Sequence, residues 1–192
     1  MSEPGPPIES TPIRVPDAAD IARARLTHFQ SWLRDRHGLT FADYDALWRW
    51  SVTDLDGFWD AVREYFDIPL HGDCTRVLAD RAMPGAQWFP GARLNYVEQV
   101  FRHRTSQRPA IVAGREDGAI QEMSWAQLER DVGALAAWLR AKGVQPGDRV
   151  VAYLPNIPET IVAFLAAASV GATWSVCSPD MGAASVLDRF RQ

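Results

Sequence analysis

Few side chains in this 192-residue chain stand in a pattern that would support nucleophilic or metal chemistry. Cys177 ends an apolar run that predicts a buried strand, and no basic neighbour favours its thiolate form, so a packed thiol is expected. Cys74 has even less support as a nucleophile. The four histidines stand singly, without a second ligand at metal-binding spacing. They are His28, His37, His71 and His103. The sequence therefore assigns no catalytic residue and no metal ligand.

One segment has the pattern of a ligand site. Ser178, Pro179 and Asp180 follow a strand predicted at 172–177 and precede a helix predicted at 182–192. Ligands of open α/β sheets gather at the carboxyl ends of strands, where free N–H groups of a helix start converge. Aspartate is also a preferred helix N-cap. From the pattern alone, capping of the last helix by Asp180 is favoured over a ligand contact.

Charge and composition exclude several classes of protein. The chain carries 24 acidic and 20 basic residues, a net charge of -4, which predicts no nucleic-acid partner. The longest apolar stretch, 161–170, is shorter than the roughly 20 residues that cross a bilayer, so no membrane partner is expected. Two cysteines far apart, with no leader-like start before them, favour a reducing, cytoplasmic location.

Short helices are expected to position the first half of the chain. Residues 1–16 contain five prolines and predict an extended arm. Apolar periodicity and breakers then predict four helices. These helices span 17–37, 41–50, 54–66 and 94–103. The aromatic stripe of the 54–66 helix has the spacing of a packing face, so a core is favoured over cofactor stacking. Prolines and glycines between 83 and 91 predict an irregular loop.

The second half predicts an α/β arrangement. Strands at 110–113 and 119–123 are expected to form a hairpin, and Ser124 with Gln127 predicts the start of a helix that Gly143 ends. A strand at 149–154, a helix at 158–170 and the strand at 172–177 read as a βαβ unit, with the first strand buried on both faces. Two parallel strands need further strands beside them. We therefore expect an incomplete sheet and a piece of a longer protein.

Several strings resemble the acyl-CoA synthetases of the adenylate-forming superfamily, and within them the type that activates acetoacetate. The strings lie at 21–33, 41–52, 58–59, 83–86, 88–96, 147–150, 154–159, 175–180 and 186–190. The tryptophan-rich early strings are the narrower signal, whereas 147–150 and 154–159 specify only the superfamily. The resemblance implies a helical cap at 17–104 and, at 105–192, the start of the large AMP-binding domain.

The resemblance also implies a chemistry for the full-length parent. Acetoacetate and ATP, with Mg²⁺, would give an acyl-adenylate and pyrophosphate, and the thiol of coenzyme A would then displace AMP. The family's phosphate loop and late lysine do not occur in these residues. No catalytic residue is therefore carried over, and the 192-residue chain is expected to be inactive and to bind none of these molecules tightly without the remainder of its chain.

One binding site is carried over from the resemblance. In acetyl-CoA synthetase the loop that matches Ser178, Pro179 and Asp180 lies against the nucleotide of coenzyme A. Glycines stand there in place of Pro179 and Asp180, and an aspartate close to the cofactor's phosphates would repel them. Two alternative functions stay open. One is a non-catalytic interaction module with a synthetase-like sequence, which a stop codon directly after Gln192 would favour. The other is a synthetase for a different short-chain acid.

Overall fold

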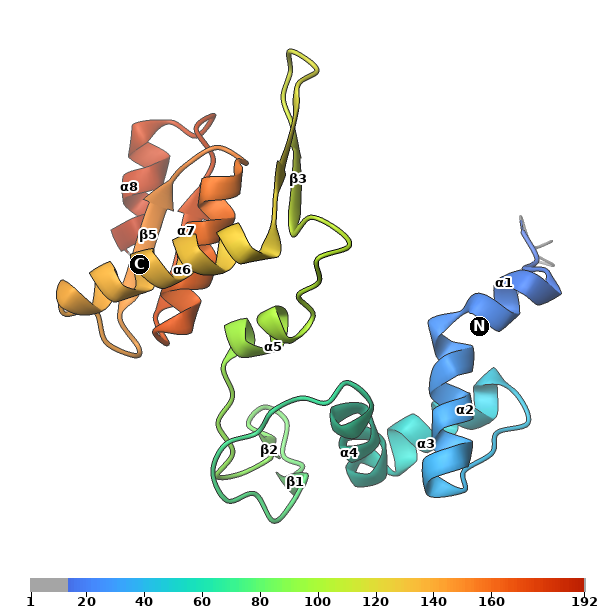
Figure 1. The fold of residues 1–192 in the computed structure, drawn as a ribbon. Coiled ribbons are helices and arrows are strands. Elements are labelled where there is room, and N and C mark those ends of the chain that lie inside the picture. The colour runs from blue at the N-terminus through green and yellow to red at the C-terminus, as the bar shows by residue number, and fades with distance from the viewer. Residues whose placement is uncertain (1–13, 192) are drawn as a thin grey trace, which may run out of the picture. The chain divides into compact units, whose positions relative to one another are not determined.

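The computed structural model describes residues 14–191, which fall into two compact units (Figure 1). The first unit holds residues 14–68 and Cys74–Pro90, and the second holds Pro69–Asp73 and residues 91–191. Most of the arm predicted at 1–16 lies outside the described residues. The predicted domain limits at 16/17 and 104/105 stay predictions.

The first unit consists of short helices and one small pair of strands. Its elements are α1 (Ala18–Arg23), α2 (Arg25–His37), α3 (Tyr44–Thr53), α4 (Leu55–Tyr65), β1 (Leu78–Asp80) and β2 (Gln87–Trp88). The last two helices are capped by aspartates: Asp43 accepts from the Ala46 N–H at 2.8 Å, and Asp54 accepts from the Gly57 N–H at 3.0 Å. The predicted start of the second helix at 41 was therefore early, because Asp43 is the residue that caps it.

The single helix predicted for 17–37 was wrong, since the chain breaks at Ala24 into α1 and α2. Ala24 has extended backbone angles, φ -64° and ψ 135°. The Thr27 hydroxyl donates to the Ile21 carbonyl at 2.6 Å and so competes with the helical hydrogen bond that this carbonyl would otherwise accept. The predicted ends of the segment are confirmed: Asp17 caps α1, and Gly38 ends α2 with φ 69°.

Aromatic rings build the core of the first unit around four buried residues, Phe29, Leu33, Leu47 and Ala61. Tyr65 of α4 meets the Phe29 and Trp32 rings of α2 edge-to-face, at centroid distances of 4.9 and 5.4 Å. Trp50 lies 5.5 Å from Phe58 in the same manner. Each such pair contributes about 0.5–1.5 kcal/mol beyond area burial. The aromatic stripe therefore packs the helices together, as the sequence predicted.

The loop predicted at 83–91 contains a strand that the sequence did not reveal. Gln87 and Trp88 pair antiparallel with Asp80 and Leu78. Asp56 of α4 holds this pair, because its carboxylate accepts from the Leu78 N–H at 3.2 Å. The Trp88 ring meets Trp59 of α4 at 5.7 Å.

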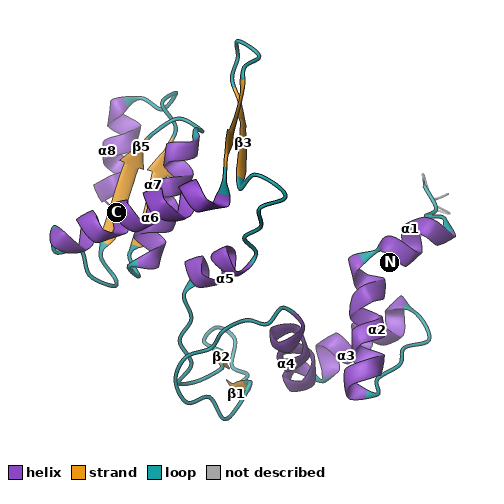
Figure 2. Cartoon of the chain, viewed as in Figure 1, coloured by secondary structure: helices purple, strands orange, loops and turns teal. Residues whose placement is uncertain are grey.

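The second unit combines a hairpin, a helix layer and a two-stranded parallel sheet (Figure 2). Its elements are α5 (Tyr96–Arg102), β3 (Ile111–Gly114), β4 (Ile120–Met123), α6 (Trp125–Ala141), β5 (Arg149–Tyr153), α7 (Pro158–Ser169), β6 (Thr173–Cys177) and α8 (Ala183–Arg191). The predicted hairpin and βαβ unit are both confirmed: β3 pairs antiparallel with β4, and β5 pairs parallel with β6.

Helices α6 and α7 pack together and against one face of this sheet. Leu165, Ala166 and Ala167 of α7 are at most 3% exposed, and the small alanines allow close approach of the neighbouring helix. Val150 and Trp174 pack against the same cluster from the strands. Ser124 starts α6 by accepting from the Gln127 N–H at 3.2 Å, as predicted.

The prediction that β5 is buried on both faces was wrong for the described residues. Exposure alternates along the strand, and Val151 and Tyr153 are each 48% exposed. One face of the strand meets the helix cluster, and Val151 and Tyr153 on the other face are about half exposed. The α/β class with a small, incomplete sheet is confirmed.

Residues 69–73 pair with the segment of chain just before α5. His71 and Arg93 exchange two backbone hydrogen bonds, each 2.8 Å long. Gly72 and Gly91 lie in these paired segments with φ 89° and 83°, and a Cβ atom on either one would clash with the opposite backbone. Only glycine satisfies both the conformation and the space.

Candidate functional site

The candidate site is the loop 178–182, which leaves the carboxyl end of β6 and enters α8. Ser178, Pro179 and Asp180 are all exposed, in agreement with the predicted position of the loop after the strand. The Met181 N–H donates to the Ser178 carbonyl at 3.1 Å and closes a turn. An open pocket of about 500 Å³ begins beside the loop, lined by Met181, Ser185, Asp188 and Arg189.

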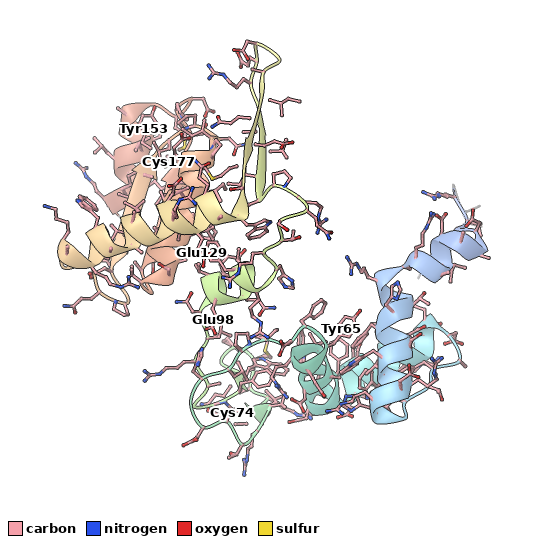
Figure 3. All side chains as sticks on the ribbon, in the orientation of Figure 1. Tyr65, Cys74, Glu98, Glu129, Tyr153 and Cys177 are labelled. Carbon is pink, nitrogen blue, oxygen red and sulfur yellow. The ribbon has the colours of Figure 1, made fainter. Side chains whose placement is uncertain are left out.

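Tyr153 anchors this loop from the neighbouring strand. It is the last residue of β5 and the register partner of Cys177, the last residue of β6; both side chains are labelled in Figure 3. Its hydroxyl oxygen lies 2.8 Å from the Pro179 carbonyl oxygen and 2.8 Å from that of Met181. The sequence analysis missed Tyr153. The signal available was its place at the end of a strand whose partner strand ends at the loop.

Asp180 is an anionic, exposed carboxylate. The Ser178 side chain and the backbone N–H of Asp180 hydrogen-bond to it and lower its pKa below the ordinary value of 3.8. The alternative that Asp180 caps the last helix does not hold. Helix α8 begins at Ala183, so Gly182 occupies the N-cap position, two residues beyond Asp180.

The two cysteines lie in different environments. Cys177 is 1% exposed at the end of β6, which matches the packed thiol expected from its apolar surroundings. Cys74 is partly exposed, and its thiol contacts the Arg76 carbonyl at 3.1 Å. Both thiols are free.

The histidines with close acidic partners form pairs with single carboxylates. His71 lies 2.7 Å from Glu98, and His37 lies 3.2 Å from Glu64. Across residues 14–191, no three His, Cys, Asp or Glu side chains converge in a way that could hold a metal ion. In the same residues, no helix has both the length and the apolar character to cross a bilayer.

A second open pocket, of about 890 Å³, lies beside the start of α6. It is bounded by the chain that connects α5 to β3 and by the first turn of α6, including Trp125. Arg104 and Glu129 pair across it at 3.0 Å. The charges of this pair compensate each other, and both side chains are more than half exposed, so the pocket has no fixed charge preference.

Comparison with known proteins identifies the class. The family model for AMP-binding enzymes matches residues 98–192, and the model described as the acetyl-coenzyme A synthetase N-terminus matches residues 44–100. The chain therefore belongs to the AMP-binding, adenylate-forming enzymes, which confirms the resemblance found in the sequence.

Several proteins to which the chain is similar are acetoacetyl-CoA synthetases. Acetoacetyl-coenzyme A synthetase of Rhizobium meliloti is 44% identical over 182 residues, 94% of this chain and 28% of that protein. Acetoacetyl-CoA synthetase of Xenopus tropicalis is 39% identical over 181 residues, 92% of this chain and 26% of that protein. The solved acetoacetyl-CoA synthetase from Streptomyces lividans is 53% identical with a TM-score of 0.87, over 92% of this chain and 28% of that one. The chain thus spans little more than a quarter of these relatives.

Proposed function

We propose that this chain is the amino-terminal part of an AMP-forming acetoacetate–CoA ligase. The observation that carries the proposal is the combined sequence and fold match to the Streptomyces lividans enzyme, at 53% identity and a TM-score of 0.87. The match includes both the aromatic helical unit and the α/β unit, since it covers 92% of the chain. A shared superfamily domain alone would match only the second unit.

The proposed reaction has two steps. An acetoacetate carboxylate oxygen attacks the α-phosphorus of ATP, which forms the acyl-adenylate and releases pyrophosphate. The thiol sulfur of coenzyme A then attacks the acyl carbon, loses its proton, and displaces AMP. Mg²⁺ would neutralise phosphate charge in the first step. Because no metal-ligating cluster exists in residues 14–191, we assign no residue of this chain to it.

We assign Ser178, Pro179 and Asp180 to the surface that meets coenzyme A. The loop is exposed, leaves the carboxyl end of a parallel strand, and is held in a defined turn. Since Asp180 is anionic, a favourable contact requires a neutral donor of the nucleotide, such as a ribose hydroxyl or an adenine amine, and not a phosphate. The cofactor's phosphates are then expected to lie away from the Asp180 carboxylate.

The 192 residues alone are proposed to be catalytically inactive. They lack the serine-, threonine- and glycine-rich phosphate loop and the late lysine that the resemblance assigns to the chemistry. We place the parent enzyme in the cytoplasm. Its free thiols, Cys74 and Cys177, support a reducing compartment.

The test is an ATP–pyrophosphate exchange assay on the full-length enzyme and, in parallel, on the 192-residue chain. Acetoacetate is compared with acetate, propionate and butyrate. We expect exchange with the full-length enzyme, fastest with acetoacetate, and none with the shorter chain. Faster exchange with another short acid would reassign the substrate. Exchange catalysed by the 192 residues would contradict the proposal that these residues alone are inactive.

A further inference from the structure

We propose that Tyr153 is a positioning residue for coenzyme A: its hydroxyl fixes the 178–182 loop, and so it controls thioester formation while leaving adenylation unaffected. The inference rests on the proposed function, because it takes the loop as part of the coenzyme A surface. It adds a residue from a different strand, which by itself touches neither acetoacetate nor ATP in the proposed arrangement.

The geometry of the hydroxyl carries the argument. The Tyr153 oxygen lies 2.8 Å from two carbonyl oxygens, those of Pro179 and Met181, and a phenol has a single proton to donate. The proton is therefore shared between two acceptors that flank Asp180 in the chain. Fixing the carbonyls on both sides of one residue fixes the direction in which that residue projects. Asp180 is consequently held outward by a group 27 positions earlier in sequence.

The remaining hydrogen bonds of the loop cannot replace this anchor. The Met181 N–H reaches the Ser178 carbonyl, and the Leu154 N–H reaches the Cys177 carbonyl at 3.1 Å. The first bond lies inside the loop, and the second ends one residue before it. Among these contacts only the Tyr153 hydroxyl ties the middle of the loop to the sheet. Without it, the two carbonyls would turn to solvent and the loop would sample several conformations.

Tyrosine at this position also has little value as a core residue. Tyr153 is 48% exposed, whereas its register partner Cys177, on the same face of the sheet, is 1% exposed. A ring that served only for packing would be expected to be buried, as Cys177 is. The hydroxyl, and not the ring, is therefore the group whose contacts are specific.

The experiment compares Tyr153→Phe with Tyr96→Phe in the full-length enzyme. Tyr96 is a half-exposed tyrosine of α5 whose ring contacts Phe164, away from the loop, so its variant controls for loss of a tyrosine hydroxyl. We expect Tyr153→Phe to raise the KM for coenzyme A on the order of fivefold, the effect of one ordinary hydrogen bond. ATP–pyrophosphate exchange should match the wild type. Tyr96→Phe should change neither.

Hydrogen exchange supplies a second readout that does not depend on activity. We expect faster amide exchange at Asp180, Met181 and Gly182 in Tyr153→Phe and wild-type rates in Tyr96→Phe. An unchanged KM for coenzyme A overturns the inference, even if the loop exchanges faster. Equal losses of exchange activity and coenzyme A use overturn it as well, because they indicate general destabilisation. A wild-type enzyme that does not adenylate acetoacetate refutes the proposed function, and the amide rates then still show whether Tyr153 holds the loop.

Discussion

The two units of this chain build their hydrophobic cores from different kinds of side chain. The first unit buries few residues and relies on large rings that meet edge-to-face while Trp59 and Trp88 stay 41% exposed. The second unit buries small aliphatic side chains completely, with Ala166 and Ala167 at 0% exposure. Helices that pack only on one another leave little area to bury, so broad aromatic surfaces compensate. Helices that lie over a sheet can instead pack closely through small residues.

Matched leucine truncations test this contrast and carry the largest expected effect. Leu33 in α2 and Leu165 in α7 are 0% and 3% exposed, so Leu33→Ala and Leu165→Ala should each cost about 2–5 kcal/mol of unfolding free energy in their own unit. Leu165→Ala should cost more, because tightly packed helices cannot close the cavity, whereas rings can tilt into it. Urea titrations followed by amide exchange in α2 and α7 measure each unit. An equal or larger cost for Leu33→Ala would remove the distinction.

Asn95 tests how the second unit holds its peripheral helix. Its side-chain oxygen caps α5 by accepting from the Val97 N–H at 3.0 Å, and its amide donates to the Ser169 carbonyl at the end of α7, also at 3.0 Å. Asn95→Ala should destabilise the second unit by about 1–2 kcal/mol, through loss of the cap and of one tertiary hydrogen bond.

Asn95→Asp is the matched control for that measurement. It keeps the acceptor for Val97 and removes the donor to Ser169, so thermal unfolding should place it between Asn95→Ala and the wild type. If the two variants unfold at the same temperature, the cap contributes nothing measurable.

The smallest expected effect is an acid dependence confined to the first unit. The Arg36 guanidinium, hydrogen-bonded to Glu64, lowers the pKa of that carboxyl below its ordinary value of 4.5. A depressed folded pKa means that Glu64 stabilises the folded unit above pH 4.5 and loses this contribution as the pH falls through the folded value. In Glu64→Gln, the melting temperature of the first unit should fall less between pH 4.5 and lower pH than it does in the wild type. Glu116→Gln, at an exposed turn residue of the second unit, should leave this pH dependence unchanged.

Local signals accounted for most helix and strand limits. Ser124, Pro158 and Gly38 each act within a few residues of their own position, so their effect on helix ends could be predicted. The break at Ala24 could not, because it depends on a threonine hydroxyl that competes for one carbonyl. The strand at Gln87–Trp88 depends on Asp56, a residue of the preceding helix whose carboxylate reaches the partner strand.

The candidate site shows the same limit. The position of Ser178, Pro179 and Asp180 after a strand could be predicted, because a buried apolar run followed by Pro and Gly is a local pattern. The part played by Tyr153 could not. It follows from the parallel register of β5 and β6, which places Tyr153 opposite Cys177, and register is a tertiary property.

The pairing of His71 with Arg93 determines how this chain can be truncated. The backbone passes from one unit to the other three times, after Ile68, after Asp73 and after Pro90. A truncation at Ile68 would therefore discard the shorter segment of the first unit, Cys74–Pro90, along with the Trp88 partner of Trp59. A stop at Pro90 keeps both segments of the first unit, but it leaves His71 without Arg93, the residue with which its backbone pairs.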